Sequence, residues 1–323
     1  MTSHLILGIN GQDGILLSRL LDNQNKSVVG IGTQRDVSVN VPRRVTYFSG
    51  NICDTSRLIE IIKNNEIGFI YNLAGISSVA HSFRDPQATL EINYQSVHSL
   101  LKALYSDLSN SHIKFFQSSS SEMFGSTRNG LQDEGSTFNP QSPYAEAKVK
   151  AHLECQRFRN EGFFVSCGIL FNHESIFRPE TFVSRKVTSS VARIKLGKQN
   201  RLHMGNLDSK RDWGSASDYV EAINAIIEHA RADDFVVATG KSHSVRDLVN
   251  FALKAVGLED RFEEFVTVDE SFIRKNDLQS TIGNASKIQR VIGWKARTSF
   301  EELIREMVNF DLRINSSGNP KNH

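Results

Sequence analysis

Residues 5–17 read LILGINGQDGILL, which is a clear indication of the fold class. The apolar start indicates a buried strand, the middle holds Gly8, Gly11 and Gly14, and the end begins an amphipathic helix. Glycine permits a tight turn there and lets the backbone approach a pyrophosphate at the helix N-terminus. The spacing is Gly-x-x-Gly-x-x-Gly rather than Gly-x-Gly-x-x-Gly, so a plain strand–helix turn is the alternative. Motifs downstream favour a dinucleotide site.

Short apolar strands and amphipathic helices alternate after this loop. Expected strands lie at 4–9, 27–31, 45–48, 69–74, 113–117 and 164–170, with helices at 15–22, 56–64, 88–105 and 143–159 between them. This alternation predicts the α/β class, with a doubly wound parallel sheet of the Rossmann type. Ligands of such sheets bind beyond the carboxyl ends of the strands, where Gly11, Ala74, Ser120 and Asn172 fall.

The pattern changes after residue 175, which suggests two domains. We predict a dinucleotide-binding domain over residues 1–175 and a smaller C-terminal substrate lobe over residues 176–314. Helices at 182–196, 218–231 and 245–255 and a strand at 235–239 would interleave this lobe with the last sheet elements. Residues 315–323 are rich in Ser, Gly, Asn, Pro and Lys, and we expect a disordered tail.

Composition narrows the possible partners. The 323 residues carry a formal net charge of +2, with 23% charged residues, which gives no electrostatic reason to expect nucleic acid or an anionic membrane. Three cysteines show neither a disulfide framework nor metal-ligand spacing. No apolar run approaches the ~20 residues of a membrane helix. Because the first strand starts close to Met1, we expect no signal peptide and a cytoplasmic protein.

Tyr144 and Lys148 form the motif Tyr-x-x-x-Lys within the expected helix 143–159. Side chains four residues apart share one helix face, and an ammonium beside a phenol favours the phenolate. The pair could therefore act as an acid/base near neutral pH. The upstream run 117–125, QSSSSEMFG, places a hydroxyl and a carboxylate, Ser120 and Glu122, where they could converge on the same spot.

The chain resembles the extended short-chain dehydrogenase/reductases, and among them the GDP-mannose 4,6-dehydratase family. The resemblance runs nearly end to end, from 8–14 to the Gly-Trp-Lys of 293–295. Its most specific motifs are GQDG at 11–14, SE at 121–122, SPY at 142–144, LFNHES at 170–175, FV at 182–183, RK at 185–186, GNLD at 205–208 and KRDWG at 210–214.

The resemblance implies a reaction that uses four residues of this chain. Tyr144 would remove the sugar O4 proton while C4 is oxidised, and Lys148 would hold the cofactor ribose and lower the pKa of the tyrosine. Glu122 would take the C5 proton and assist the loss of water from C6, to which the hydride then returns. Ser120 stands where the family usually has threonine, and its hydroxyl would still bond to O4. The alternative for Glu122 is an ordinary solvated carboxylate.

The second strand bears on the cofactor. An NAD site usually ends this strand with an acid that holds the ribose 2′-hydroxyl. In the segment that follows this strand no acid comes before Asp36, and Arg35 could bind a 2′-phosphate. Arg35 and the resemblance to the family together favour NADP as the cofactor. The cofactor residues that the resemblance implies are Gly8, Asn10, Gly11, Gln12, Asp13, Gly14, Arg35, Asn51, Ile52, Leu73, Ala74, Tyr144, Lys148, Leu170, His173 and Arg178.

The resemblance also implies residues that bind a GDP-sugar. They are Ser77, Ser78, Asn172, Phe182, Val183, Lys186, Arg211, Arg274 and Asp277. Near the sugar the chain departs from the family, with ISSV at 76–79 for Gln-Ser-His-Val and IFRP at 176–179 for Pro-Arg-Arg-Gly or Pro-Leu-Arg-Gly. These changes predict a roomier, less polar pocket. We favour a GDP-hexose other than mannose, first GDP-N-acetylglucosamine as in legionaminic acid synthesis, with GDP-mannose left open.

Two alternatives to a dehydratase remain. A GDP-sugar 4-reductase or epimerase of the same fold would need Tyr144 and Lys148 but no C5 base. A non-catalytic dinucleotide-binding protein would have no need of Ser120 and Glu122 as well. The resemblance further implies a homodimer or homotetramer, with the helices 88–105 and 143–159 in a four-helix bundle.

Overall fold

The computed structural model describes residues 2–107, 112–127, 130–269, 272 and 278–316. Within them, seven strands form one sheet in the order β10-β6-β5-β4-β1-β2-β3, and each neighbouring pair is parallel. The strands are β1 (Ser3–Leu7), β2 (Val28–Gly32), β3 (Thr46–Ser49), β4 (Ile67–Asn72), β5 (Lys114–Ser120), β6 (Val165–Leu170) and β10 (Asp234–Val237). The predicted doubly wound parallel sheet is confirmed, and its strand order reverses between β1 and β4.

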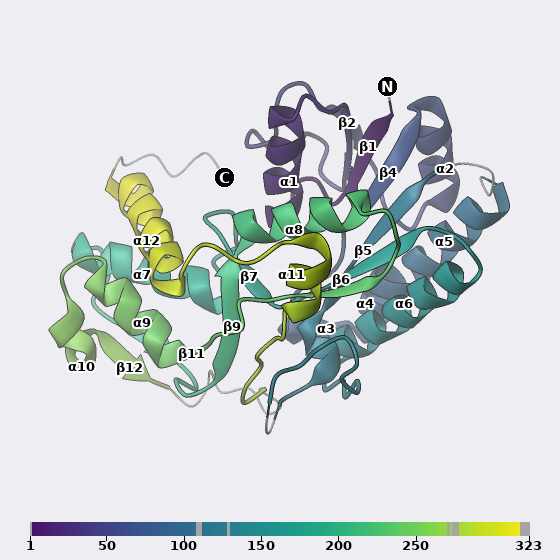
Figure 1. Ribbon diagram of the computed structural model, residues 1–323. Coiled ribbons are helices and arrows are strands. Elements are labelled where there is room, and N and C mark those ends of the chain that lie inside the picture. Colours follow the sequence, from purple (N-terminus) through teal and green to yellow (C-terminus); the bar gives the residue numbers. More distant parts are fainter. Residues whose placement is uncertain (1, 108–111, 128–129, 270–271, 273–277, 317–323) are drawn as a thin grey trace.

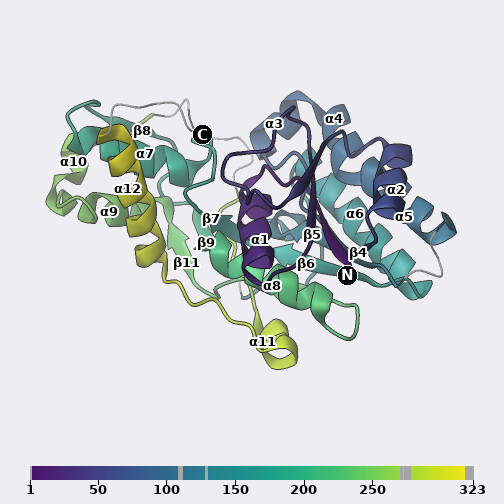
Figure 2. The same cartoon turned by 90° about the horizontal axis from the view of Figure 1, so that it is seen from above.

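Helices cover both faces of this sheet, as Figures 1 and 2 show. The helices α2 (Thr55–Asn64), α5 (Ser96–Asp107) and α6 (Pro143–Asn160) pack on one face, and α1 (Gln12–Asn23), α8 (Ala216–Glu228) and α11 (Ser286–Ile292) pack on the other. Each face buries a continuous apolar cluster, which explains why the strands are apolar on both sides.

A smaller lobe lies beside the carboxyl ends of the strands (Figures 1 and 2). It has its own apolar core, built chiefly from α7 (Val183–Lys195), α9 (Val245–Lys254) and α12 (Phe300–Ser316). Two small sheets complete it, β11-β9-β7 and β12-β8. Their strands are β7 (Asn172–Glu174), β8 (Leu202–Met204), β9 (Lys210–Ser215), β11 (Ser242–Ser244) and β12 (Val266–Val268), and short helices η3 (Glu259–Arg261) and α10 (Phe262–Phe265) precede β12.

The expected helix 88–105 is three segments in the structure. After α3 (Val79–Arg84), α4 (Pro86–Leu90) runs into a π-helical turn, η1 (Glu91–Gln95), and then into α5. A π turn inserts an extra residue into the helix and often occurs at functional sites. Hydrophobic periodicity averages over one extra residue, so the sequence predicted one uninterrupted helix.

The elements α8 and β10 come after residue 175 yet complete the large sheet, and the boundary at 175/176 stays a prediction. The last helix includes Asn315 and Ser316, so the predicted disordered tail is wrong for these two residues, and 317–323 lie outside the described residues. No helix in the described part of the chain is long and apolar enough to cross a membrane.

Candidate active site

The glycine-rich loop forms a cradle between β1 and α1. Gly8 has φ +85°, and a Cβ atom on it would lie 2.8 Å from the Ala74 Cα. A Cβ atom on Gly14 would lie 2.4 Å from the Gly8 carbonyl oxygen. Gly11 caps α1 without a side-chain hydrogen bond, so no capping side chain occupies the N-terminus of the helix. The residues present therefore fit the pyrophosphate of a dinucleotide.

Two polar residues of this loop join it to β7. Asp13 Oδ2 lies 2.9 Å from His173 Nε2, and the other ring nitrogen lies 2.7 Å from the Phe171 carbonyl. Burial alone would lower the pKa of His173, but the Asp13 carboxylate raises it above its usual value. Gln12 donates to the His173 carbonyl at 3.0 Å and accepts from Ser175 Oγ at 2.9 Å. In the protein alone, both side chains thus fix the cradle against the second half of the chain.

Tyr144 and Lys148 lie on the face of α6 that packs on β5. Tyr144 is 8% exposed and Lys148 is 6% exposed. The Lys148 ammonium donates to the Ser118 carbonyl at 2.8 Å and lies 5.8 Å from the centre of the tyrosine ring. A hydrogen bond with Ser120 lowers the pKa of Tyr144. The structure therefore brings Tyr144, Lys148 and Ser120 together, as the sequence predicted.

The expected lowering of the tyrosine pKa is wrong for the protein alone. Burial raises the pKa of Tyr144 to about 12, and the nearby Glu122 carboxylate raises it too, whereas Ser120 and Arg178 lower it. Burial also lowers the pKa of Lys148 to about 8. In water an ammonium beside a phenol favours the phenolate, but burial of the two groups opposes the charged form of each.

Glu122 sits in a short 3-10 turn, η2 (Ser121–Phe124), directly after β5. Ser120 caps this turn, because its hydroxyl accepts from the Glu122 N–H at 3.3 Å. Glu122 is partly buried, and its negative charge contributes to the raised pKa of Tyr144. The carboxylate therefore lies within electrostatic reach of the phenol, and the predicted convergence of the two groups on one substrate stays a prediction.

Arg178 contributes a positive charge to the same site, on a side chain that is 15% exposed. Its Nε lies 3.2 Å from Glu174 Oε2, and its guanidinium stacks 3.8 Å from the centre of the Phe182 ring. Its charge lowers the pKa of both Tyr144 and Asp13. Arg178 thus lies within electrostatic reach of the phenol and of the first turn of α1.

The remaining predicted cofactor residues follow the strand ends. Asn10 accepts from the Ser38 N–H at 2.9 Å and so tethers the loop after β2. Arg35, on that loop, is exposed. The residues that follow β3 and β4 and that end β6 are Asn51, Ile52, Leu73, Ala74 and Leu170.

The predicted substrate residues are more scattered. Ser77 is exposed, and Ser78 caps α3 by accepting from the His81 N–H at 3.2 Å. Lys186 lies 4.0 Å from the centre of the Phe272 ring, and Arg211 donates to the Leu278 carbonyl at 2.6 Å. Asn172 begins β7, Phe182 caps α7 and Val183 begins it. Arg274 and Asp277 lie outside the described residues.

Asn93 is a site residue that the sequence argument missed. It is 2% exposed and lies in the π turn η1. Its side chain accepts from the Ile76 N–H at 2.8 Å and donates to the Ile76 carbonyl at 2.9 Å. A Cβ atom on Gly75 would lie 2.8 Å from Asn93 Oδ1 and 3.9 Å from Lys148 Nζ. Asn93 therefore holds the loop after β4 beside Lys148, and an asparagine in an apolar helix was the only signal.

The comparisons with known structures agree with this architecture. The UDP-glucose 4-epimerase of Thermotoga maritima superimposes with a TM-score of 0.86 at 21% identity, covering 97% of this chain and 100% of that one. The dTDP-glucose 4,6-dehydratase of Bacillus anthracis, in complex with NAD, gives a TM-score of 0.83 at 17% identity, covering 98% of both chains. With its Tyr-x-x-x-Lys face, the fold is that of the extended short-chain dehydrogenase/reductases.

Sequence comparison gives the family. The model of the family described as GDP-mannose 4,6 dehydratase matches residues 5–307. The GDP-mannose 4,6 dehydratase 1 of Arabidopsis thaliana is 38% identical over 329 residues, which are 96% of this chain and 90% of the relative. The chain belongs to the GDP-mannose 4,6-dehydratase family and is a lyase of the hydro-lyase class.

Proposed function

We propose that the protein is an NADP-dependent 4,6-dehydratase of a GDP-hexose, which forms the GDP-4-keto-6-deoxy-sugar. The observation that carries this proposal is the placement of a carboxylate, Glu122, next to the Tyr144–Lys148–Ser120 set. Besides the hydride acceptor, oxidation at C4 requires only the tyrosine, the lysine and the hydroxyl. The removal of a C5 proton requires a further base, and Glu122 is in the position to be that base.

In the proposed mechanism each group has one task. Tyr144 takes the proton from the sugar O4, with Ser120 donating a hydrogen bond at the same oxygen. Lys148 holds the cofactor ribose. A bound nicotinamide dinucleotide would supply the hydride chemistry between C4 and C6. Glu122 takes the C5 proton, which the 4-ketone has made acidic, and gives a proton to the C6 hydroxyl as it leaves as water.

The choice of NADP rests on the loop after β2. Among residues 33–35 it carries Arg35 and no acid, and a guanidinium pairs well with a phosphate. The residues that would hold the rest of the cofactor are the glycine cradle, Asn10 and Lys148. The GDP-sugar would lie toward the small lobe, against Asn172, Lys186 and Arg211.

The sugar is proposed to differ from mannose, with GDP-N-acetylglucosamine first. Ile76 and Ser78 lie on the loop after β4, where the family has glutamine and histidine. Serine is smaller than histidine and isoleucine is less polar than glutamine, so the pocket would accept a bulkier, less polar substituent. A site built to bond a particular hydroxyl would lose much of its selectivity without those groups.

We also propose a homodimer or homotetramer that uses α5 and α6. Their inner sides pack in the core on one face of the sheet, and Tyr105 and Leu153 are 39% and 49% exposed. Exposed apolar groups on two adjacent helices fit a four-helix contact between two subunits.

The experiment is to incubate the protein with GDP-mannose, GDP-N-acetylglucosamine and a GDP-heptose and a catalytic amount of NADP. Mass spectrometry should find a product lighter by one water, formed in large excess over NADP, with solvent deuterium at C5. Net formation of NADPH matching product would show an oxidoreductase, and a product of unchanged mass would show an epimerase.

The Glu122→Gln variant tests the base. The 4-keto sugar should accumulate, and dehydration and C5 deuterium uptake should fall by the ~10²–10⁴-fold typical of a lost general acid/base. Glu146→Gln, an exposed carboxylate in the first turn of α6, is the matched control. Normal dehydration by Glu122→Gln would remove the main chemical support for the proposal.

A further inference from the structure

The inner face of α6 contacts the end of β5 at three successive residues, 118–120. Lys148 Nζ donates to the carbonyl of the first at 2.8 Å. His152 Nδ1 lies 2.9 Å from the hydroxyl of the second. Tyr144 shares a hydrogen bond with the hydroxyl of the third. The three helix residues are spaced by four, so they lie on one face, and His152 continues the catalytic pair by one turn.

These contacts matter because the end of β5 has a strand on one side only. The pairing of β5 with β4 stops at Asn72↔Gln117, whereas its pairing with β6 continues to Ser120↔Leu170. Within the described sheet, residues 118–120 are therefore held by one neighbouring strand. Side chains of α6 supply additional contacts to this segment, which presents Ser120 and Glu122 to the site.

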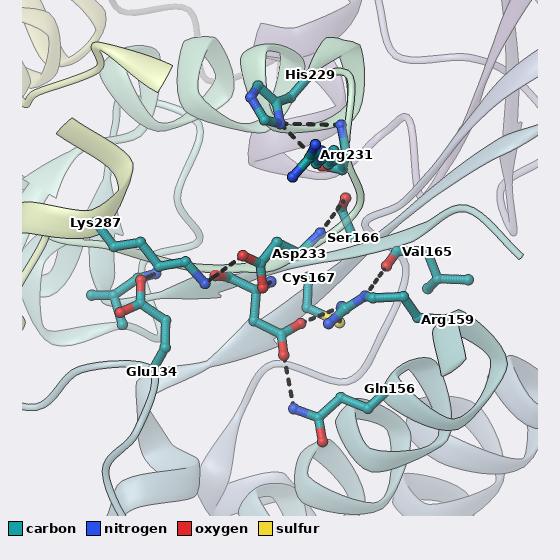
Figure 3. Close-up of polar contacts among 12 residues, drawn as sticks. Glu134, Gln156, Arg159, Val165, Ser166, Cys167, His229, Arg231, Asp233 and Lys287 are labelled. Atoms are coloured by element: carbon teal, nitrogen blue, oxygen red, sulfur yellow. Dashed lines mark hydrogen bonds and ion pairs between the residues drawn. The ribbon is translucent and has the colours of Figure 1, made fainter. Parts of the chain in front are cut away.

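His152 is itself anchored at the far side of its ring. Its Nε2 lies 3.2 Å from Gln156 Nε2 and 3.5 Å from Asp234 Oδ2. Gln156 donates to the same Asp234 oxygen at 2.7 Å, and Arg159 forms an ion pair with the other oxygen. Figure 3 shows Gln156 and Arg159 reaching from α6 toward the edge of the sheet. The imidazole thus bridges the start of β10 and the end of β5.

The hydrogen-bond pattern places a proton on His152 Nδ1. The Gln156 amide donates one N–H to Asp234 and presents the other to Nε2, so the neutral ring carries its proton on Nδ1. Burial opposes ionisation, but Cys167 and Asp234 raise the pKa of His152 above its usual value. In the ionised ring Nδ1 is protonated as well. In both states, the ring donates to the Ser119 hydroxyl.

Two other readings of this cluster fit less well. His152, Cys167 and Asp234 have atoms within 4.8 Å of one another and could hold a metal ion, but Asp234 already pairs with the guanidinium of Arg159. Ser119, His152 and Asp234 also have the order of a nucleophilic triad. They are 3%, 1% and 6% exposed, so a sugar nucleotide does not reach the serine.

We propose that His152 is a positioning residue of the active site, which through Ser119 fixes the end of β5 that carries Ser120 and Glu122. This inference rests on the proposed function for its effect on turnover. Its structural part, the ordering of residues 118–124, is independent of the substrate.

Two isosteric variants separate positioning from packing. In His152→Asn the amide replaces the Nδ1 side of the ring and can still donate to Ser119, while in His152→Gln it replaces the Nε2 side and loses that bond. We expect His152→Gln to lower kcat about tenfold, the effect of one hydrogen bond, with KM little changed, and His152→Asn to stay near wild type. Equal losses in both variants, or none in either, would overturn the proposal.

Ser119→Ala is the second route if His152→Gln does not fold. It should give the same loss of kcat, and adding it to His152→Gln should produce no further loss. Cys155→Ala, a buried change on the same helix, controls for damage to the packing of α6 and should leave kcat unchanged. A larger loss in the double variant than in either single variant would show that the two residues act separately.

Amide hydrogen exchange gives a readout without substrate. Peptides covering 118–124 should exchange faster in His152→Gln and Ser119→Ala than in wild type and His152→Asn. Should the wild type dehydrate no GDP-sugar, the proposed function fails, and this exchange still decides the role of His152. Equal exchange in all four proteins would refute it.

Discussion

The two ends of the proposed cofactor site are built differently. At the catalytic end, Tyr144 and Lys148 are 8% and 6% exposed and bonded to the end of β5. At the other end, Arg35 is exposed on a loop whose backbone is tethered by Asn10 and by the hydroxyl of Tyr47, 2.5 Å from the Gln34 carbonyl.

Cofactor selectivity and reaction chemistry are therefore separable in this site. A buried side chain couples stability, pKa and reaction, because desolvation acts on all three. An exposed side chain on a fixed loop can change its partner without disturbing the fold. Changes at the catalytic end should therefore affect both rate and stability, and changes at the loop should affect cofactor selectivity alone.

The largest expected effect comes from Tyr144→Phe. The variant keeps the ring and the packing but loses the hydroxyl that takes the O4 proton, so oxidation at C4 should fall by at least ~10²–10⁴-fold. No 4-keto sugar should accumulate, in contrast to Glu122→Gln. Product analysis by mass spectrometry checks this. Accumulation of the 4-keto sugar in Tyr144→Phe would mean that another group takes the proton.

The alkaline stability of the protein tests the burial of the same phenol. Because the pKa of Tyr144 is raised from 10.0 to about 12, the folded protein keeps this proton at pH values where the unfolded chain has lost it. The free energy of unfolding should therefore fall between pH 10 and 12, by roughly 3 kcal/mol more in wild type than in Tyr144→Phe. Urea unfolding across this range measures the difference, and parallel curves would contradict the raised pKa.

Lys148 should act in the opposite direction at lower pH. Its pKa is lowered from 10.5 to about 8, so the folded protein releases this proton before the unfolded chain does. Stability from this group rises with pH between about 8 and 10.5. Urea unfolding of Lys148→Met across the same pH range isolates the contribution of Lys148 to the free energy of unfolding.

Much of the fold and the grouping of the proposed catalytic residues could be predicted from the sequence. The predicted strands at 4–9, 27–31 and 164–170 are observed within about two residues, because runs of buried apolar side chains between turn signals leave few alternatives. Ser120, Glu122, Tyr144 and Lys148 were predicted from their spacing and their resemblance to a family. They meet because α6 crosses the end of β5.

What could not be predicted depends on contacts between distant residues. No sequence motif includes His152. Its contacts with Ser119 and Asp234 connect α6 with β5 and β10. The pairing of Asp13 with His173 spans the two halves of the chain. The π turn that holds Asn93 has no hydrophobic pattern of its own. The direction of the Tyr144 pKa shift depends on how deeply the phenol is buried, and burial depth cannot be read from the sequence.

The glycine cradle should show an intermediate effect. A Cβ atom in Gly14→Ala would lie 2.4 Å from the Gly8 carbonyl oxygen and 2.5 Å from the Ile9 Cα, and both are backbone atoms that cannot rotate away. We expect a loss of about 1–3 kcal/mol in the free energy of unfolding, as for other overpacked sites. Gly11→Ala is the matched control, since its nearest atom would be 3.3 Å away and its φ of −77° suits alanine. Equal losses in the two variants would contradict the crowding seen at Gly14.

The smallest effect on the free energy of unfolding is expected from Arg35→Asp. This variant also tests most directly whether the two ends of the site are separable. The loop is held by backbone contacts to Asn10 and Tyr47 that this change leaves intact, so the free energy of unfolding should stay the same. The affinity for NADP should fall at least about tenfold, the value of a lost charged hydrogen bond, while the affinity for NAD changes little or rises. Calorimetric titration with both cofactors measures this. Arg43→Asp, the same charge change at another exposed position, controls for a general electrostatic effect. Equal losses for NADP and NAD would show that Arg35 does not face a 2′-phosphate, and a loss of stability would show that the two ends of the site are not separable after all.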